Sequence, residues 1–499
     1  MQPYESLEAH FTRIFHLSHA KAMISWDEAT MMPVGGGAAR GEAHATIDVL
    51  MHEMVTDPRV SDWLAGIDER RLDRWQQANI REIRKWHEKA SCLPGDLVEA
   101  QARATSACEQ AWRSARASND WDGLRPKLET VFSLARREAE IRSAVSNLPL
   151  YDAMLDIYEP GMSSQRLTEE FGYLKSFLPD FIQSVIESQK SHPALPLEGP
   201  FSDEQQKQLG LKMMETLGFN FNKGRLDVSH HPFCGGVPDD VRITTRYRND
   251  SFLESMMATL HETGHALYEQ GLPVDWRTQP VGDALSFATH ESQSLLMEMQ
   301  ACRSPEFARF VTPVIQSICG AGRSEDTAWQ SDNVYRLLTH VETGYIRVDA
   351  DEVTYPMHVI MRFEIEKAII EGDLLLEDLP DVWNEKMQAY FGLDTSGNFK
   401  DGCLQDVHWP AGLIGYFPTY TLGAMTAAQL FHSAREQNPH LMQQIEKGDF
   451  SQLVAWLRTH VHEKGRSHTF DELLTSATGS SLDVSYFVNH LKTRYLSDA

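Results

Sequence analysis

The sequence predicts a mainly α-helical fold with one small β-sheet. Most of the chain repeats apolar residues three or four positions apart, which is the period of an amphipathic helix. Alternation of β-branched and polar residues, typical of a strand, is clearest between residues 225 and 247. At 499 residues the chain can bury a large core and exceeds the usual size of one domain. We find no internal repeat and no low-complexity segment.

Residues 1–190 form a succession of amphipathic helices rich in Ala, Glu, Arg and Leu. Three consecutive glycines at positions 35–37 should break the second of them. Residues 192–201 contain three prolines and a glycine and form the clearest linker. We therefore divide the chain into three regions that join in one integrated structural unit: an N-terminal helical region (1–191), a central region with the candidate site (192–430), and a C-terminal helical region (431–499), expected to stay helical to Ala499.

A strand and a helix should follow the linker. Residues 240–247 alternate β-branched and polar side chains and are expected to form a strand. Residues 252–270 repeat apolar side chains with helical period and predict a helix of about 20 residues. Ser251 and Glu254 have the spacing of a capping box at its start, and Gly271 supplies a stop at its end.

Residues 261–265, within this helix, read His-Glu-Thr-Gly-His. His261 and His265 lie one helical turn apart on one face, so both can bind one Zn²⁺. Glu262 can take a proton from a water at the metal as that water attacks a peptide carbonyl. Gly264 costs roughly 1 kcal/mol against alanine in a helix, so we expect a neighbouring helix or the metal site close by. The motif predicts zinc-dependent peptide hydrolysis.

A catalytic zinc site needs a third protein ligand and one open position. The helical segment 283–301 offers Glu291 and Glu298, and the loop before it is long enough to fold it back beside the first helix. We choose Glu291, for which an ordinary salt-bridged glutamate is the alternative. Ligating histidines usually give their other N–H to a carboxylate or carbonyl. Asp240 could accept it, although Asp240 and Arg242 could equally be an ordinary ion pair. The predicted strand 240–247, just before the zinc helix, could also serve as a sheet edge with which an extended peptide pairs by backbone hydrogen bonds; an ordinary sheet strand is the alternative.

Composition narrows the function classes. The 46 basic and 71 acidic residues give a net charge of −25, which argues against nucleic acid and anionic membrane as partners. The six cysteines are widely spread without close pairs, which suits a reducing cytosol. Neither a signal peptide nor a run of about 18 apolar residues is evident, so we expect a cytoplasmic protein.

Six further segments match, in order, the motifs of a known family. They are Ser25-Trp26-Asp27 with Thr30-Met31-Met32-Pro33, His231-Pro232-Phe233, Asp240-Val-Arg242-Ile-Thr244, His290-Glu-Ser-Gln-Ser-Leu-Leu296, Ile346-Arg347-Val-Asp349-Ala350-Asp351 and Gly402-Cys-Leu-Gln405-Asp406-Val-His408-Trp409. Together they resemble the carboxypeptidase Taq-like (thermostable carboxypeptidase 1) family of zinc metallocarboxypeptidases, and the resemblance spans most of the chain.

The resemblance implies a fold and an activity. The family has a two-lobed helical body with a deep substrate groove, a small sheet beside the zinc helices, and usually a homodimeric assembly. By this resemblance residues 1–191 would form part of the groove wall. It releases single amino acids from peptides with a free C-terminus, with broad specificity. Zinc would be held by His261, His265 and Glu291, with Glu262 as the general base. The same ligands can hold Co²⁺ or Mn²⁺.

Several residues are candidates for contacts with the substrate. Arginine suits the terminal carboxylate because its planar fork pairs with both oxygens. The candidates are Arg242, Arg246, Arg248, Arg347 and Arg362, of which the resemblance favours Arg347; a structural ion pair is the common alternative. The resemblance also favours Tyr420 and His408 as oxyanion donors. Further candidate substrate contacts are His231, Arg242, Gln405 and Asp406, where Gln405 and Asp406 could instead position His408.

Two other functions stay open. One is a zinc oligopeptidase or dipeptidyl-peptidase on a similar scaffold, which would not need a carboxylate-binding arginine one residue beyond the scissile bond. The other is a protein whose zinc is structural or whose groove only binds peptides. A structural site has four protein ligands and no use for a base such as Glu262.

Overall fold

The computed structural model describes residues 3–320 and 322–496. It is mainly α-helical with one three-stranded sheet, which confirms the predicted fold class. None of the described helices is both long enough and apolar enough to cross a bilayer.

The N-terminal part is a run of helices, and its breaks lie at polar caps, glycines and prolines. A capping box of Asp73 and Gln76 starts α4. The glycines at 35–37 separate α1 from α2 and do not interrupt the second helix, and residues 192–201 contain no helix or strand. The helices are α1 (Pro3–Thr30), α2 (Gly37–Val55), α3 (Pro58–Ala65), α4 (Arg74–Ser91), α5 (Gly95–Ser118), α6 (Trp121–Ser146), α7 (Leu150–Leu155), α8 (Ser164–Gln189) and α9 (Asp203–Leu217).

A second run of helices follows the sheet, and its last described residue is Leu496. The final residues of the predicted C-terminal helix, 497–499, lie outside the described part of the chain. The helices are α10 (Leu253–Gly271), α11 (Phe287–Leu295), α12 (Pro305–Ile318), α13 (Ser331–Leu338), α14 (Tyr355–Glu371), α15 (Leu379–Phe391), α16 (Pro418–Gln437), α17 (Leu441–Ile445), α18 (Ser451–His460), α19 (Phe470–Thr478) and α20 (Val484–Leu496). A π-helical segment, Leu296–Ala301, extends α11.

The predicted helix 252–270 is confirmed as α10, but its predicted capping box is wrong. The residue before α10 is Phe252, and no side chain caps the helix. Glu254 instead pairs with Arg246 at 2.8 Å and Arg248 at 3.3 Å. Two nearby guanidinium groups therefore compete successfully with the backbone N–H for this carboxylate.

The sheet comprises β1 (Gly224–Val228), β2 (Phe233–Val237) and β3 (Asp240–Thr245) in the order β1-β3-β2. The central strand β3 pairs with β1 in parallel and with β2 in antiparallel orientation. Val241 and Ile243, two residues apart, point to one face and are fully buried in a cluster that includes Ala266 of α10. The sheet is thus anchored to α10.

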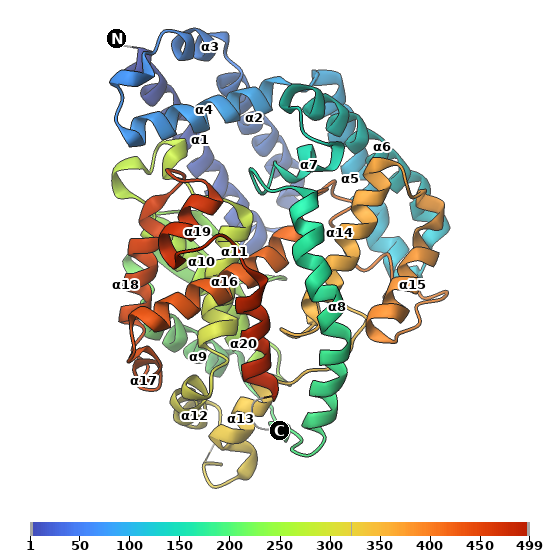
Figure 1. The fold of residues 1–499 in the computed structure, drawn as a ribbon, viewed down its shortest axis with the longest axis vertical. Helices are drawn as coiled ribbons and strands as arrows, with labels where there is room; N and C mark the ends of the chain where they lie inside the picture. Colours follow the sequence, from blue (N-terminus) through green and yellow to red (C-terminus); the bar gives the residue numbers. More distant parts are fainter. Residues whose placement is uncertain (1–2, 321, 497–499) are drawn as a thin grey trace.

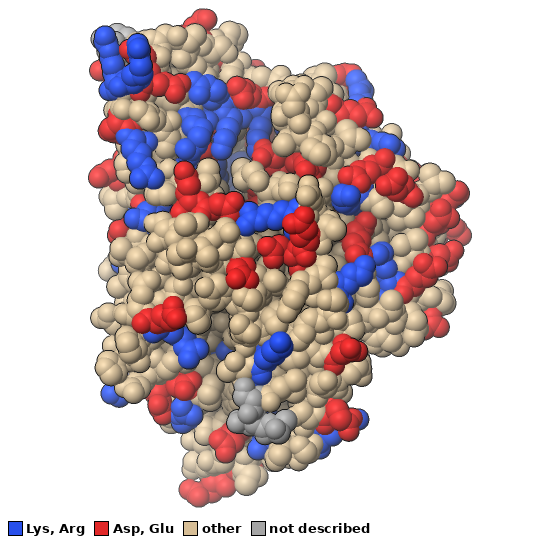
Figure 2. Space-filling view, viewed as in Figure 1, with Lys and Arg blue, Asp and Glu red and all other residues tan. Residues whose placement is uncertain are grey.

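The helices form two groups (Figure 1). One group comprises α5–α8 with α14 and α15, and the other comprises α9–α12 with α16–α20, while α1–α4 lie across the top of the view. This arrangement agrees with the two-lobed body expected from the resemblance. Figure 2 shows Lys and Arg gathered over α4 on this face, and Asp and Glu along the edge formed by α6 and α15.

Two fully buried carboxylates fix the loops between the lobes. Glu366 of α14 accepts hydrogen bonds from the Tyr151 hydroxyl at 2.8 Å, the Trp409 indole at 2.7 Å and the Gly415 amide at 2.6 Å. Glu159 accepts from the Ser286 hydroxyl at 2.8 Å and the Ala288 amide at 3.0 Å, at the start of α11.

Both carboxyl groups should make stability depend on pH. Burial outweighs the hydrogen bonds and raises the pKa of Glu159 and of Glu366 from 4.5 to about 7. Because the folded state holds these protons more tightly, their contribution is fully present below pH ~4.5 and is lost as the pH rises through ~7. We expect the thermal midpoint to fall between pH 5 and 8, and to fall less in Glu159→Gln and Glu366→Gln. An equal fall in these variants and in the exposed control Glu187→Gln would contradict this origin.

Candidate active site

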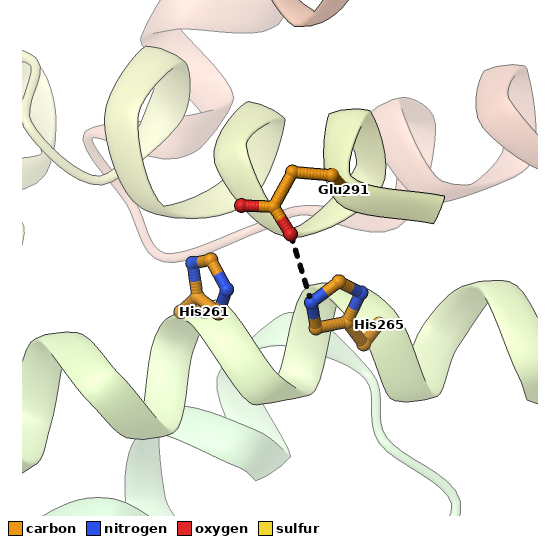
Figure 3. Close-up of side chains that lie close together, drawn as sticks. All are labelled: His261, His265 and Glu291. Carbon is orange, nitrogen blue, oxygen red and sulfur yellow. Dashed lines mark ion pairs between the residues drawn. The ribbon is translucent and has the colours of Figure 1, made fainter. Parts of the chain in front are cut away.

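His261, His265 and Glu291 lie together where α10 and α11 pack against each other. One potential ligand atom from each residue lies within 4.8 Å of the other two. His265 Nε2 is 3.5 Å from Glu291 Oε2. Figure 3 shows Glu291 pointing from α11 toward the two imidazoles on α10. The structure therefore brings together the three residues that the sequence indicated as metal ligands.

Glycines allow α11 to approach its neighbours closely. A Cβ on Gly264 of α10 would lie 2.5 Å from the Gln293 carbonyl oxygen, and one on Gly423 of α16 would lie 2.8 Å from Glu291 Cβ. Any larger residue at either position would displace the backbone or side chain that carries Glu291. The expectation that Gly264 makes room for a neighbouring helix is thus confirmed.

A carboxylate supports His261 from its far side. His261 Nδ1 lies 2.9 Å from Glu298 Oε2, and Glu298 Oε1 accepts from Arg303 Nη2 at 2.8 Å. Glu298 lies in the π-helical segment after α11, where the wider turn changes the direction of its side chains. The sequence offered Glu298 only as a competing ligand and did not predict this contact. Asp240, the candidate histidine partner, instead pairs with Arg242 at 2.7 Å.

A histidine and a carboxylate support His265 in series. His265 Nδ1 lies 2.6 Å from His290 Nδ1, and His290 Nε2 lies 2.8 Å from Glu269 Oε1. If Nε2 of His265 binds a metal, its Nδ1 carries the proton, so His290 Nδ1 must accept and His290 Nε2 must donate to Glu269. Sequence reasoning missed this series of contacts from His265 through His290 to Glu269, although Glu269 lies one turn after His265 on the same helix.

The charges at this site fit a divalent cation. Burial lowers the pKa of His261, but the carboxylates of Glu298, Glu291 and Glu262 outweigh it and raise this pKa to about 10. Burial raises the pKa of Glu262 to about 7. The His261 shift indicates an excess of negative charge around this imidazole, which a divalent metal would balance. Two imidazoles and one carboxylate are also ligands that zinc takes in catalytic sites.

Arg347 lies on the groove wall and is held by fixed partners. It is 4% exposed, and its Nε and Nη2 donate to Asp406 Oδ1 at 3.0 and 2.8 Å, while Nη1 donates to the Tyr355 hydroxyl at 2.6 Å. Arg362 Nε donates to the other Asp406 oxygen at 2.6 Å. Gln405 accepts from the Arg347 backbone amide at 2.8 Å. Gln405 and Asp406 therefore lie behind Arg347, outside the groove lining.

His408, Tyr420 and His231 line the same groove as the metal cluster. His408 Nε2 lies 3.2 Å from the Tyr420 hydroxyl. Burial and the charge of Arg347 lower the pKa of His408 to about 4, so this imidazole is neutral at pH 7. Two uncharged polar groups thus lie close together in the groove that also contains the acidic metal cluster.

The strand expected to pair with a peptide is not the exposed one. β3 is paired along both of its edges, whereas Phe233 and Cys234 of the edge strand β2 line the groove. Arg242 on β3 lies outside the groove lining, where it pairs with Asp240 and covers the Trp26 ring at 6.0 Å from its centroid. The alternation of residues in the sequence could not by itself show which strand would lie at the edge of the sheet.

Comparison with known proteins decides the family. The model of the carboxypeptidase Taq (M32) metallopeptidase family matches residues 6–495. The chain belongs to this family. It is 37% identical to thermostable carboxypeptidase 1 of Thermus thermophilus, covering 99% of this chain and 98% of the relative, and 33% identical to carboxypeptidase 1 of Bacillus subtilis, covering 97% and 96%. The structure of Trypanosoma cruzi metallocarboxypeptidase 1 superimposes over 100% of both chains with a TM-score of 0.97 and 42% identity.

Membership of the carboxypeptidase Taq family identifies the chain as a metallocarboxypeptidase with a metal cofactor. Its groove has a volume of about 1460 Å³ and is lined by residues of α4, α10, α11, α13, α14 and α16. The wall therefore draws on both lobes, and the candidate metal ligands lie within it.

Proposed function

We propose that this metallocarboxypeptidase uses zinc and releases single amino acids, with broad specificity, from peptides that have a free C-terminus. The observation that carries the proposal is the convergence of His261, His265 and Glu291 within 4.8 Å, beside Glu262 in the groove. Co²⁺ or Mn²⁺ can occupy the same three ligands, so they are expected to substitute.

Glu262 is the proposed general base. When bound, zinc would polarise the scissile carbonyl and lower the pKa of a water in the site. Glu262 takes the proton from the attacking water and gives it to the departing amine. Burial in the groove wall raises the pKa of Glu262 above its ordinary value, which makes its carboxylate a stronger base than one in water.

Tyr420 and His408 are the proposed oxyanion donors. A negative charge develops on the carbonyl oxygen during the attack, and a neutral, already oriented donor stabilises it without reorganisation. The 3.2 Å contact between His408 and Tyr420 keeps the hydroxyl oriented. Ring contacts of Tyr420 with Tyr355 at 5.9 Å and Tyr416 at 5.3 Å restrict its motion further.

Arg347 is the proposed partner of the substrate's terminal carboxylate. Arg347 and Arg362 together carry two positive charges against the one negative charge of Asp406, which leaves one net positive charge at the groove wall. Gln405 and Asp406 position Arg347 and do not touch the substrate in this proposal. His231 contacts substrate from the groove lining, whereas Arg242 is committed to Asp240.

The test uses a peptide of about ten residues with its C-terminus either free or amidated, and reads the products of the zinc-loaded protein by mass. Single-residue losses from the free C-terminus that the amide blocks are expected. Internal or two-residue cuts that ignore the amide would favour an oligopeptidase or dipeptidyl-peptidase. Absence of cleavage would leave a protein that only binds peptides.

His290 and Glu269 should raise the affinity of the site for zinc. Loss of a group that orients a ligating histidine typically costs 10- to 100-fold in metal affinity, because the ligand's orientation and basicity are no longer set. We expect His290→Ala and Glu269→Gln to raise the zinc Kd by such a factor, measured by competition with a chelator of known affinity. The exposed control His340→Ala should leave the Kd unchanged, and an unchanged Kd in His290→Ala would contradict the role.

We also propose a cytoplasmic homodimer. The resemblance to homodimeric carboxypeptidases motivates the assembly, and the six unpaired thiols with the net charge of −25 fit a reducing, aqueous compartment. Light scattering on a size-exclusion column would measure twice the chain mass if the dimer forms, and 56.6 kDa if it does not.

A further inference from the structure

Three aromatic rings form a platform in the groove, and the proposed mechanism uses only one of them, Tyr416, whose ring packs against Tyr420. Phe287, Tyr158 and Tyr416 lie edge to face in a triangle, with ring centroids 5.5 Å apart for Tyr158 and Phe287, 5.4 Å for Phe287 and Tyr416, and 5.2 Å for Tyr158 and Tyr416. All three line the groove, and Phe287 remains 48% exposed. An exposed aromatic surface inside a binding groove indicates a contact with a ligand, whereas a single exposed apolar residue elsewhere on the surface needs no such explanation.

The platform is rigid because its three segments are tied together. The Phe287 amide donates to the Tyr158 carbonyl at 3.2 Å, and the next residue, Glu159, holds the start of α11. Gly415 has a φ of +92°, and a Cβ there would lie 2.9 Å from the backbone of α7. Only glycine allows this approach, which brings Tyr416 against Tyr158. A preorganised surface loses little entropy when it binds a side chain.

The position of the platform relates it to the substrate. Phe287 lies four residues before Glu291 on α11, so both project from one face of the helix. Arg347 covers the Tyr420 ring at 5.2 Å, Tyr420 contacts Tyr416 at 5.3 Å, and Tyr416 belongs to the platform. Tyr420, a proposed oxyanion donor, thus lies between the platform and Arg347, the proposed partner of the substrate's terminal carboxylate. The Tyr416 ring lies 5.3 Å from the Tyr420 ring, and an extended peptide advances roughly 3.3–3.6 Å per residue, so the platform begins one to two residues beyond the proposed oxyanion donor.

We propose that Phe287, Tyr158 and Tyr416 form a subsite for an aromatic side chain one to three positions upstream of the scissile bond. The inference rests on the proposed function, because it needs a peptide anchored at Arg347. Edge-to-face contact with an additional ring is worth about tenfold in affinity. The enzyme should therefore favour aromatic residues upstream while it remains broadly specific for the residue it releases.

The test uses acetylated alanine pentapeptides with a free C-terminus, in which one Phe replaces Ala at the first, second or third position upstream of the scissile bond. Released alanine gives kcat/KM for each peptide. In the wild type, one of the three Phe peptides should exceed the all-alanine peptide about tenfold. In Phe287→Ser this ratio should fall to within about twofold, whereas Phe287→Trp should retain it. The matched control Phe221→Ser, 42% exposed outside the groove lining, should keep the wild-type ratio.

Two failures are distinguishable. A wild type that trims all peptides from the C-terminus without preference for any Phe peptide, or a ratio that survives in Phe287→Ser, would overturn the subsite and leave the proposed function intact. Internal cleavage, or trimming that ignores amidation, would overturn the proposed function and the subsite with it.

Discussion

Replacing Glu262 by Gln should lower kcat by about 10²- to 10⁴-fold while zinc stays bound. Glutamine has the same shape but cannot accept the proton from the attacking water. The metal ligands His261, His265 and Glu291 are untouched, so the metal content should not change. Steady-state kinetics on a free-C-terminus peptide and zinc per chain by emission spectroscopy measure the two quantities.

The matched control for this variant is Glu215→Gln, an exposed glutamate on α9 that pairs with Lys212. It should keep wild-type kcat and zinc content. Retained turnover in Glu262→Gln would exclude Glu262 as the base. Loss of zinc together with turnover would show instead that Glu262 shapes the metal site.

Replacing Arg347 by Ala should reduce kcat/KM for peptides with a free C-terminus by about 10²- to 10³-fold, because truncating one partner of a buried charge pair costs roughly 2–5 kcal/mol. Cleavage of an amidated peptide is already absent in the proposed mechanism, so its rate should not change. Arg347→Lys keeps the charge but loses the planar fork, and we expect an intermediate loss. The measurement is the ratio of kcat/KM between wild type and variant.

Two controls separate substrate binding from folding. Asp406 keeps its ion pair with Arg362 when Arg347 is removed, so the far-UV circular dichroism and zinc content should persist. Arg246→Ala removes a half-exposed arginine outside the groove lining and should leave kcat/KM unchanged. Equal activity of Arg347→Ala and wild type would assign the carboxylate to another group and favour the oligopeptidase.

Local sequence patterns predicted the parts of the site that lie on one helix. The helical period placed His261 and His265 on one face of α10, and the structure has them there with a ring separation of 5.0 Å. Glycine at position 264 predicted close packing, which α11 provides. The choice of Glu291 over Glu298 gained its main support from the family resemblance, because both lie on the same predicted helix and spacing alone does not rank them.

The contacts that the sequence did not predict depend on packing between distant segments. Glu298 reaches His261 from the π-helical segment that extends α11. No local sequence pattern predicted this segment. His290 reaches His265 because the helices cross at Gly264. Arg347 does form an ion pair, which was the alternative weighed for the candidate arginines, but its partner is Asp406, 59 positions away in the sequence.

Strand order was the other feature beyond sequence reasoning. The alternation over 240–247 correctly predicted β3, which lies within those bounds. Its role as an exposed edge was wrong, because β1 and β2 pair with both sides of β3. Short strands joined by turns can pair in several orders that leave the same residues buried, so only tertiary packing selects one.

The most direct test of the account is anomalous diffraction at the zinc edge from crystals of the zinc-loaded protein. We expect one strong peak roughly 2.0–2.2 Å from His261 Nε2, His265 Nε2 and a Glu291 carboxylate oxygen, with one position open to solvent. A peak coordinated by four protein side chains, or one located away from these three residues, would contradict the proposed catalytic centre.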